Sequence, residues 1–129
     1  MNRRNCLQTM LVAAVPAAAQ AQNPKSIQLH VDLSVDPAKE KEMLQTFRNT
    51  FRPAAAKQAG FIDAKMLKLR TALMGKGPAG ANYRFELVFQ SEELRQKWVA
   101  SDIHKKVWPM IEQSLSSKDY TVLLYDVGA

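Results

Sequence analysis

Two histidines are the side chains of this sequence best suited to acid–base chemistry near neutral pH. His104 stands three and four residues before Val107 and Trp108, so a helix here turns the imidazole toward the same side as these apolar residues. A titratable ring aimed at an apolar interior can deprotonate or hydrogen-bond a ligand. It can equally be a core histidine that Asp102 or a backbone carbonyl satisfies, and the sequence is compatible with both.

The second histidine and the two tryptophans are further candidates. His30 and Asp32 are two residues apart in an alternating segment, so a strand points both toward one face. They form either a base with its orienting carboxylate or a structural polar pair, and the pattern favours the pair. Trp98 and Trp108 can form a platform for a flat substrate, although aromatic residues at helical spacing more often belong to a core.

The segment from 81 to 108 contains the elements that must position these side chains. Apolar and polar residues alternate from Tyr83 to Phe89, which predicts a strand with one buried face. Ser91 then caps a helix that carries Trp98, because its hydroxyl can accept from the free amides of the first turn. Asp102 is expected to cap the helix that follows.

The remaining elements complete a simple pattern. Alternation predicts three more strands, from Ile27 to Val35, from Phe61 to Thr71 and from Tyr120 to Val127. Asp36 and Pro37 begin a helix that ends near Gly60, with a kink at Pro53, and Pro109 is expected to kink the second helical region. The order β-α-β-β-α-β predicts an α+β fold with ferredoxin-like topology, an antiparallel sheet with both helical regions on one face.

Two common kinds of site find little support. The loop from Gly75 to Gly80 spells G-x-G-x-x-G, but a strand follows it instead of a helix, so it is interpreted as a hairpin connection and not a nucleotide site. Cys6 is the only cysteine of the chain, and it lies in the N-terminal segment. With two histidines and no other thiol, a metal site is not expected, and no cofactor is predicted.

The first 21 residues have the pattern of a bacterial export signal. A paired arginine precedes an apolar run from Met10 to Ala19 and the small-x-small sequence that ends at Ala21. The arginine pair resembles the twin-arginine motif, with the general secretory route as the alternative. The run is too short to span a bilayer core of about 30 Å, so the mature chain, a linker (22–26) and one domain (27–129), is expected in the periplasm or outside the cell without a membrane span.

Charge gives little guidance to partners. The net charge is +6, of which the signal contributes two, and the other cations are scattered along the chain. This distribution is typical of a solvated basic surface. RNA recognition motifs share the predicted topology, but export and the absence of their glycine-containing motif on the third strand exclude nucleic acid as the expected partner.

The sheet face without helices is expected to mix polar and apolar side chains. Its members are Gln28, His30, Asp32, Leu67, Leu69, Arg84, Glu86 and Val88. This face is too apolar for water and too charged for a dry core. A second copy packing sheet on sheet satisfies it best, with Arg84 and Glu86 as an expected ion pair in the interior, so the sequence predicts a homodimer.

The topology and two runs of residues, Phe89 to Leu94 and Trp98 to His104, resemble the antibiotic biosynthesis monooxygenase (ABM) family of dimeric α+β barrels. The resemblance extends from Ile27 to about Asp126. It implies a homodimer with a pocket between sheet and helices in each subunit. It also implies oxidation of a small aromatic molecule, a phenol or quinol, without a cofactor.

In this family the pocket uses tryptophan, tyrosine, asparagine and arginine to hold a phenolate while it reacts with oxygen. The counterparts here are His104 and Arg84 as catalytic residues and Trp98, Tyr83, Trp108 and His30 as substrate-binding residues. The haem-degrading branch fits less well, because Phe89 and Trp108 stand where that branch has a tryptophan and a histidine ligand. The alternative function is a barrel that binds a small ligand without catalysis.

Overall fold

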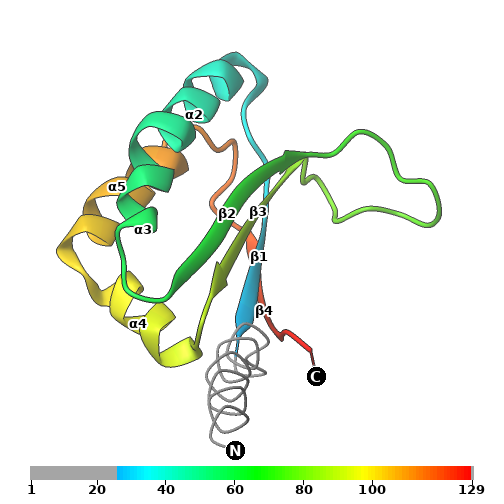
Figure 1. Ribbon diagram of the computed structural model, residues 1–129. Coiled ribbons are helices and arrows are strands. Elements are labelled where there is room, and N and C mark those ends of the chain that lie inside the picture. The colour runs from blue at the N-terminus through cyan, green and yellow to red at the C-terminus, as the bar shows by residue number, and fades with distance from the viewer. Residues whose placement is uncertain (1–25, 129) are drawn as a thin grey trace, which may run out of the picture.

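A computed structural model describes residues 26–128, which form one antiparallel sheet covered by helices on one face (Figure 1). The strands are β1 (Ile27–Leu33), β2 (Phe61–Lys68), β3 (Tyr83–Phe89) and β4 (Thr121–Asp126). They lie in the order β2-β3-β1-β4, and each neighbouring pair is antiparallel. This is the ferredoxin-like α+β fold that the sequence predicts.

The helices come in two regions, one between β1 and β2 and the other between β3 and β4. The first contains η1 (Pro37–Lys39), α2 (Glu40–Thr46), η2 (Phe47–Phe51) and α3 (Arg52–Ala56), and the second contains α4 (Glu92–Ala100) and α5 (Asp102–Glu112). Figure 1 shows both regions on the same side of the sheet. The other side, called the outer face below, carries no helix in the part of the chain that the structure describes.

The two prolines are accommodated differently. Pro53 lies at the start of α3, directly after η2, which is a π-helical turn. A proline removes a backbone donor and crowds the carbonyl one turn before it, and a wider π turn relieves both problems. The irregularity predicted at Pro53 therefore takes this form. Pro109 lies inside α5, which continues beyond it to Glu112.

Helix caps agree with the sequence in two of three places. Asp36 and Ser91 accept hydrogen bonds from amides of the first turn of η1 and α4, as predicted. The prediction for the last helix is wrong by one residue. Ser101, not Asp102, caps α5, and its hydroxyl accepts from the His104 amide at 3.2 Å. Asp102 is the first helical residue, where its charge suits the helix dipole.

The core lies between the sheet and the helices. The inward side chains of β1 and β3 are buried, and the alternation predicted for Tyr83–Phe89 is observed. Phe51 and Trp98, each about 1% exposed, fill the space between the two helical regions. Burying side chains of this size contributes about 1.5–3 kcal/mol each, so these aromatic contacts fix the relative position of the helices.

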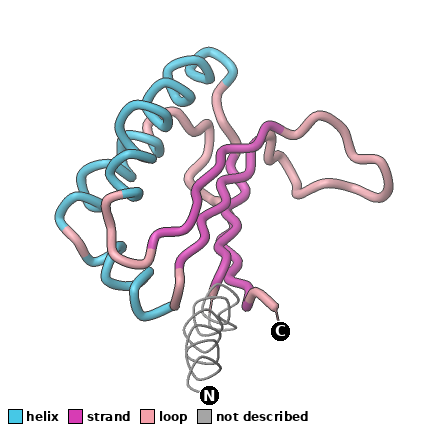
Figure 2. The backbone as a smooth tube through the Cα atoms, viewed as in Figure 1, coloured by secondary structure: helices cyan, strands magenta, loops and turns pink. Residues whose placement is uncertain are grey.

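A long connection between β2 and β3 extends away from the body of the domain (Figure 2). The strand predicted to reach Thr71 ends at Lys68, and the loop continues to the start of β3. Leu73 and Met74 near its tip are each 94% exposed. Within residues 26–128, no helix has the length and apolar character needed to cross a membrane.

Candidate functional site

A pocket of about 190 Å³ lies between the sheet and helices α4 and α5. Strands β1, β3 and β4 form its floor with apolar side chains, Leu29, Val31, Phe85, Leu87 and Val122. The remaining lining includes Phe51 and the side chains described below. The pocket lies where the resemblance to ABM proteins implies one.

Two helices place the functional groups of this pocket. Three residues of α4 line the pocket, Arg95, Trp98 and Val99. They occupy positions i, i+3 and i+4, which lie on one side of a helix. His104 and Trp108 line it from α5, one turn apart. The structure therefore brings together three of the six predicted site residues, His104, Trp98 and Trp108.

The imidazole of His104 lies between two indole rings. Its centroid is 4.9 Å from that of Trp98, with the planes perpendicular at 90°, and 6.4 Å from that of Trp108, with the planes nearly parallel at 14°. No group in residues 26–128 makes a hydrogen bond to the imidazole nitrogens, and neither Asp102 nor a backbone carbonyl satisfies them as the core alternative required. The ring is therefore available to a ligand.

The protonation state of His104 follows from its surroundings. Burial lowers the pKa of the imidazole below its ordinary value, and the positive charge of Arg95 lowers it further, while Glu112 has a smaller opposite effect. At neutral pH the ring is thus neutral, with one nitrogen able to accept a hydrogen bond or a proton. This is the state that a general base needs.

Tyr120 holds the indole of Trp108 in position, although the sequence analysis did not single it out. The Trp108 Nε1 donates to the tyrosine hydroxyl at 3.0 Å, and that hydroxyl donates to Glu112 Oε2 at 2.7 Å. Burial raises the pKa of Tyr120, and the bond to Glu112 adds to the rise against the effect of Trp108. The hydroxyl is therefore a fixed proton donor to Glu112 and an acceptor for the indole.

Arg95 is the second residue that sequence analysis missed. It lines the pocket and makes two bonds to Glu92, Nε to Oε1 at 2.6 Å and Nη2 to Oε2 at 2.7 Å. The hydrogen bonds to Glu92 raise the pKa of Arg95. Its spacing of three residues before Trp98 was the available signal, because any helix that buries Trp98 brings Arg95 to the same side.

Tyr83, a predicted substrate-binding residue, lies elsewhere. Its ring is buried on the helix side of β3, and its hydroxyl donates to Glu40 Oε2 at 2.5 Å. Lys68 also contacts this carboxylate, at 2.7 Å. Burial and the bond to Glu40 raise the pKa of Tyr83 to about 12. The hydroxyl is therefore committed to α2, and Tyr83 does not line the pocket that contains His104.

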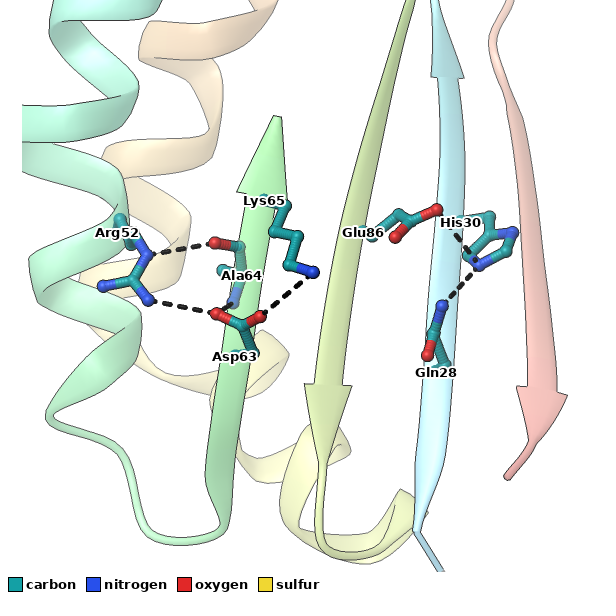
Figure 3. Close-up of polar contacts among 7 residues, drawn as sticks. All are labelled: Gln28, His30, Arg52, Asp63, Ala64, Lys65 and Glu86. Carbon is teal, nitrogen blue, oxygen red and sulfur yellow. Dashed lines mark hydrogen bonds and ion pairs between the residues drawn. The ribbon is translucent and has the colours of Figure 1, made fainter. Parts of the chain in front are cut away.

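His30 and Arg84 lie on the outer face, separated from His104 by the sheet. His30 Nε2 lies 2.8 Å from Gln28 Nε2 and 3.6 Å from Glu86 Oε2 (Figure 3). Arg84 donates to both oxygens of Asp32, at 2.8 and 3.3 Å. The predicted pairs of Arg84 with Glu86 and of His30 with Asp32 are not the ones that form.

The strand register explains these partners. His30 is directly opposite Glu86, and Asp32 is directly opposite Arg84, across the β1–β3 ladder. Opposed residues are closer than residues two apart on one strand, so each group pairs across the ladder. A larger hollow of about 320 Å³ is lined by Asp32, Tyr83 and Arg84, together with Leu67, Leu69 and Arg70. It lacks both His104 and the tryptophans, so the smaller pocket is the candidate site.

Metal binding has no visible basis in the part of the chain that is described. No group of three His, Cys, Asp or Glu side chains in residues 26–128 is placed to hold an ion.

Comparison with known proteins is informative at the level of structure. No family model and no curated protein matches the sequence significantly. A mutant of SnoaB, a cofactor-independent oxygenase from Streptomyces nogalater, has a TM-score of 0.64 at 14% identity, covering 81% of this chain and 95% of that chain. A candidate antibiotic biosynthesis monooxygenase from Caulobacter crescentus reaches 0.67 at 14% identity, covering 88% and 99%.

This chain has the fold of the ABM proteins. The resemblance predicted from the sequence is thus confirmed for the fold, which identities this low can show without showing activity. A dimeric ferredoxin-like protein of unknown function from Jannaschia has a TM-score of 0.66 at 13% identity, covering 79% of this chain and 99% of that chain.

Proposed function

We propose that this protein is an ABM-type monooxygenase that oxidises a small phenol or quinol without a cofactor. The observation that supports the proposal best is the His104 ring, which is neutral, free of hydrogen bonds to residues 26–128 and enclosed between Trp98 and Trp108. A general base with an unoccupied nitrogen beside two aromatic faces suits a flat substrate with an acidic hydroxyl.

The reaction can be written with the groups at hand. His104 accepts the phenolic proton, and the electron-rich phenolate reacts with O2. One oxygen atom bonds to a ring carbon para to the hydroxyl and becomes a carbonyl oxygen, while that carbon loses its one hydrogen and the phenolic oxygen becomes the second carbonyl of a quinone. The other oxygen leaves as water with that ring hydrogen and the phenolic proton that the histidine returns, so the substrate supplies all four electrons that reduce O2. The protein contributes the base, the orientation and the exclusion of water.

The size of the pocket limits the substrate. At about 190 Å³ it is smaller than the roughly 300–1,000 Å³ of sites for drug-sized ligands. An apolar floor and two indole walls favour a flat molecule of one or two rings. Larger fused systems would require the pocket to extend.

A homodimer and export complete the proposal. On the outer face, Leu67 and Leu123 are each 42% exposed and Tyr125 is 47% exposed. A second copy packed on this face would cover them while the ion pairs of Arg84 and His30 stay satisfied. The predicted export signal and the linker up to residue 25 fall outside the described range, and export is proposed on the sequence pattern alone.

Oxygen uptake by the purified mature protein tests the activity. A panel of hydroquinones, anthrones and haem is offered to the wild type, His104→Ala and Lys105→Ala, the last being an exposed neighbour on α5 that does not line the pocket. We expect uptake with a quinol of one or two rings and a loss of about a hundredfold for His104→Ala. Lys105→Ala should retain full activity. Absence of uptake from the whole panel would reject the oxygenase in favour of the ligand-binding alternative.

A further inference from the structure

Arg95 is the one residue with a permanent charge among the described residues that line the pocket. Its side chain is 18% exposed, so most of it is removed from water. A charge in an otherwise apolar pocket is costly unless it is paired. Its position beside the candidate substrate site therefore requires a reason.

The guanidinium of Arg95 donates only two of its N–H groups to acceptors in residues 26–128. Its bonds to Glu92 engage Nε and one N–H of Nη2. The planar group has five N–H bonds, so the edge formed by Nη1 and the second N–H of Nη2 remains. No acceptor in residues 26–128 takes a hydrogen bond from that edge. Two parallel N–H bonds in a plane match the two oxygens of a carboxylate.

Glu92 holds the arginine in place without cancelling its effect in the pocket. It lies three residues before Arg95, in the first turn of α4, and is itself 33% exposed. The pKa of His104 is lowered by the charge of Arg95. The positive charge of the guanidinium thus reaches the interior of the pocket, where it favours an anion.

We propose that Arg95 binds a carboxylate of the substrate, and that the pocket takes a small aromatic acid of one or two rings. The inference rests on the proposed function for its identification of the pocket as the substrate site. In this arrangement the guanidinium on α4 holds the carboxylate, the tryptophans enclose the ring, and the imidazole on α5 faces the phenolic hydroxyl. Arg95 is then the residue that selects substrates by charge.

The pocket should select substrates by charge because a ligand that leaves the free guanidinium edge without acceptors binds at a cost. A neutral aromatic of the same shape would take water from the guanidinium and offer no second acceptor in exchange. Sites built to bond a polar group reject analogues that lack it much more strongly than apolar pockets reject a change in size. Lysine would preserve the charge but not the planar fork, so the two cations should differ in this position.

Calorimetric titration with matched pairs tests the inference without any turnover. The probes are salicylate against salicylamide and 1-naphthoate against 1-naphthamide, which differ in charge and little in shape. The proteins are the wild type, Arg95→Met, Arg95→Lys and Lys97→Met, the last removing an exposed charge from the same helix. We expect the wild type and Lys97→Met to prefer at least one acid over its amide by about ten- to a hundredfold.

The expected result for Arg95→Met is equal affinity for acid and amide, with the amide bound at least as well as by the wild type. Arg95→Lys should recover part of the preference. Equal binding of acids and amides by the wild type, a preference that survives in Arg95→Met, or no binding of any probe overturns the inference. Acid binding without oxygen uptake rejects the oxygenase alone, and oxygen uptake by a wild type that binds acids and amides equally rejects the role of Arg95 alone.

Discussion

His104 lies edge to face with Trp98, and a single hydroxyl links the backbones of these two residues. Ser101 Oγ donates to the Trp98 carbonyl at 2.6 Å and accepts from the His104 amide at 3.2 Å. It thereby ends α4 and begins α5 at the same point. The perpendicular arrangement of imidazole and indole is a consequence of this corner, which also aims both rings into the pocket.

Replacement of Ser101 by alanine should loosen the corner. Loss of a helix cap costs about 1 kcal/mol, and urea unfolding should show a decrease of that size. Ser91→Ala removes the comparable cap of α4 and serves as the control. We expect only Ser101→Ala to change the ring signals of His104 in NMR spectra and to weaken ligand binding, whereas Ser101→Thr restores both. Equal effects of the two alanine variants on the pocket would contradict this role.

The lowered pKa of His104 predicts how stability depends on pH. The unfolded chain binds a proton at the ordinary histidine pKa, near 6.5, whereas the folded chain binds it only at lower pH. The free energy of unfolding should therefore fall as the pH decreases below 6.5 toward the folded pKa, and this contribution should be constant above about pH 7. NMR titration should give a midpoint below 6.5.

Urea unfolding from pH 7.5 to 5 provides the thermodynamic check. Taking the difference between wild type and His104→Gln removes contributions from the groups that both proteins share. The stability of the wild type relative to His104→Gln should be constant above about pH 7 and should decrease below pH 6.5, because only the wild type contains the His104 imidazole. A wild-type midpoint above 6.5, or parallel curves, would show that burial does not govern this histidine.

The fold was predictable because its signals are local. The alternation from Tyr83 to Phe89 and the caps at Asp36 and Ser91 each depend on a few neighbouring residues, and the structure confirms them. The cap of α5 was misplaced because Ser101 and Asp102 are both good capping residues one position apart. Which of the two residues caps α5 depends on how α4 and α5 meet at Ser101, and a local sequence pattern does not specify this.

The site was predictable only in part because sequence periodicity does not say which groups meet across elements. His104, Trp98 and Trp108 were found from helical spacing. Tyr83 and Arg84 are adjacent on one strand, so β geometry sends them to opposite faces, and neither reaches the pocket. Strand register, which no local pattern fixes, selects the partners of Arg84.

Tyr120→Phe should destabilise the domain and release the indole of Trp108. The change removes the bond from Trp108 and the bond to Glu112, and each is worth about 1 kcal/mol. Urea unfolding should show a loss of about 1–2 kcal/mol, and the tryptophan fluorescence should shift. Tyr125→Phe is the control, since that tyrosine is 47% exposed on the outer face. Equal losses for the two variants would remove Tyr120 from this positioning role.

Light scattering on the mature protein at micromolar concentration should give the mass of a dimer. Leu123 lies opposite His30 on the outer face and is 42% exposed, so a charge placed there would be buried in a sheet-on-sheet interface. Leu123→Glu should yield monomers, because an unpaired buried charge costs several kcal/mol. Leu73→Glu, near the tip of the loop where the side chain is 94% exposed, introduces the same charge away from the sheet and should leave the dimer intact. A wild-type monomer, or a dimer that Leu123→Glu does not affect, would remove the outer face as the interface and leave its leucines without a partner.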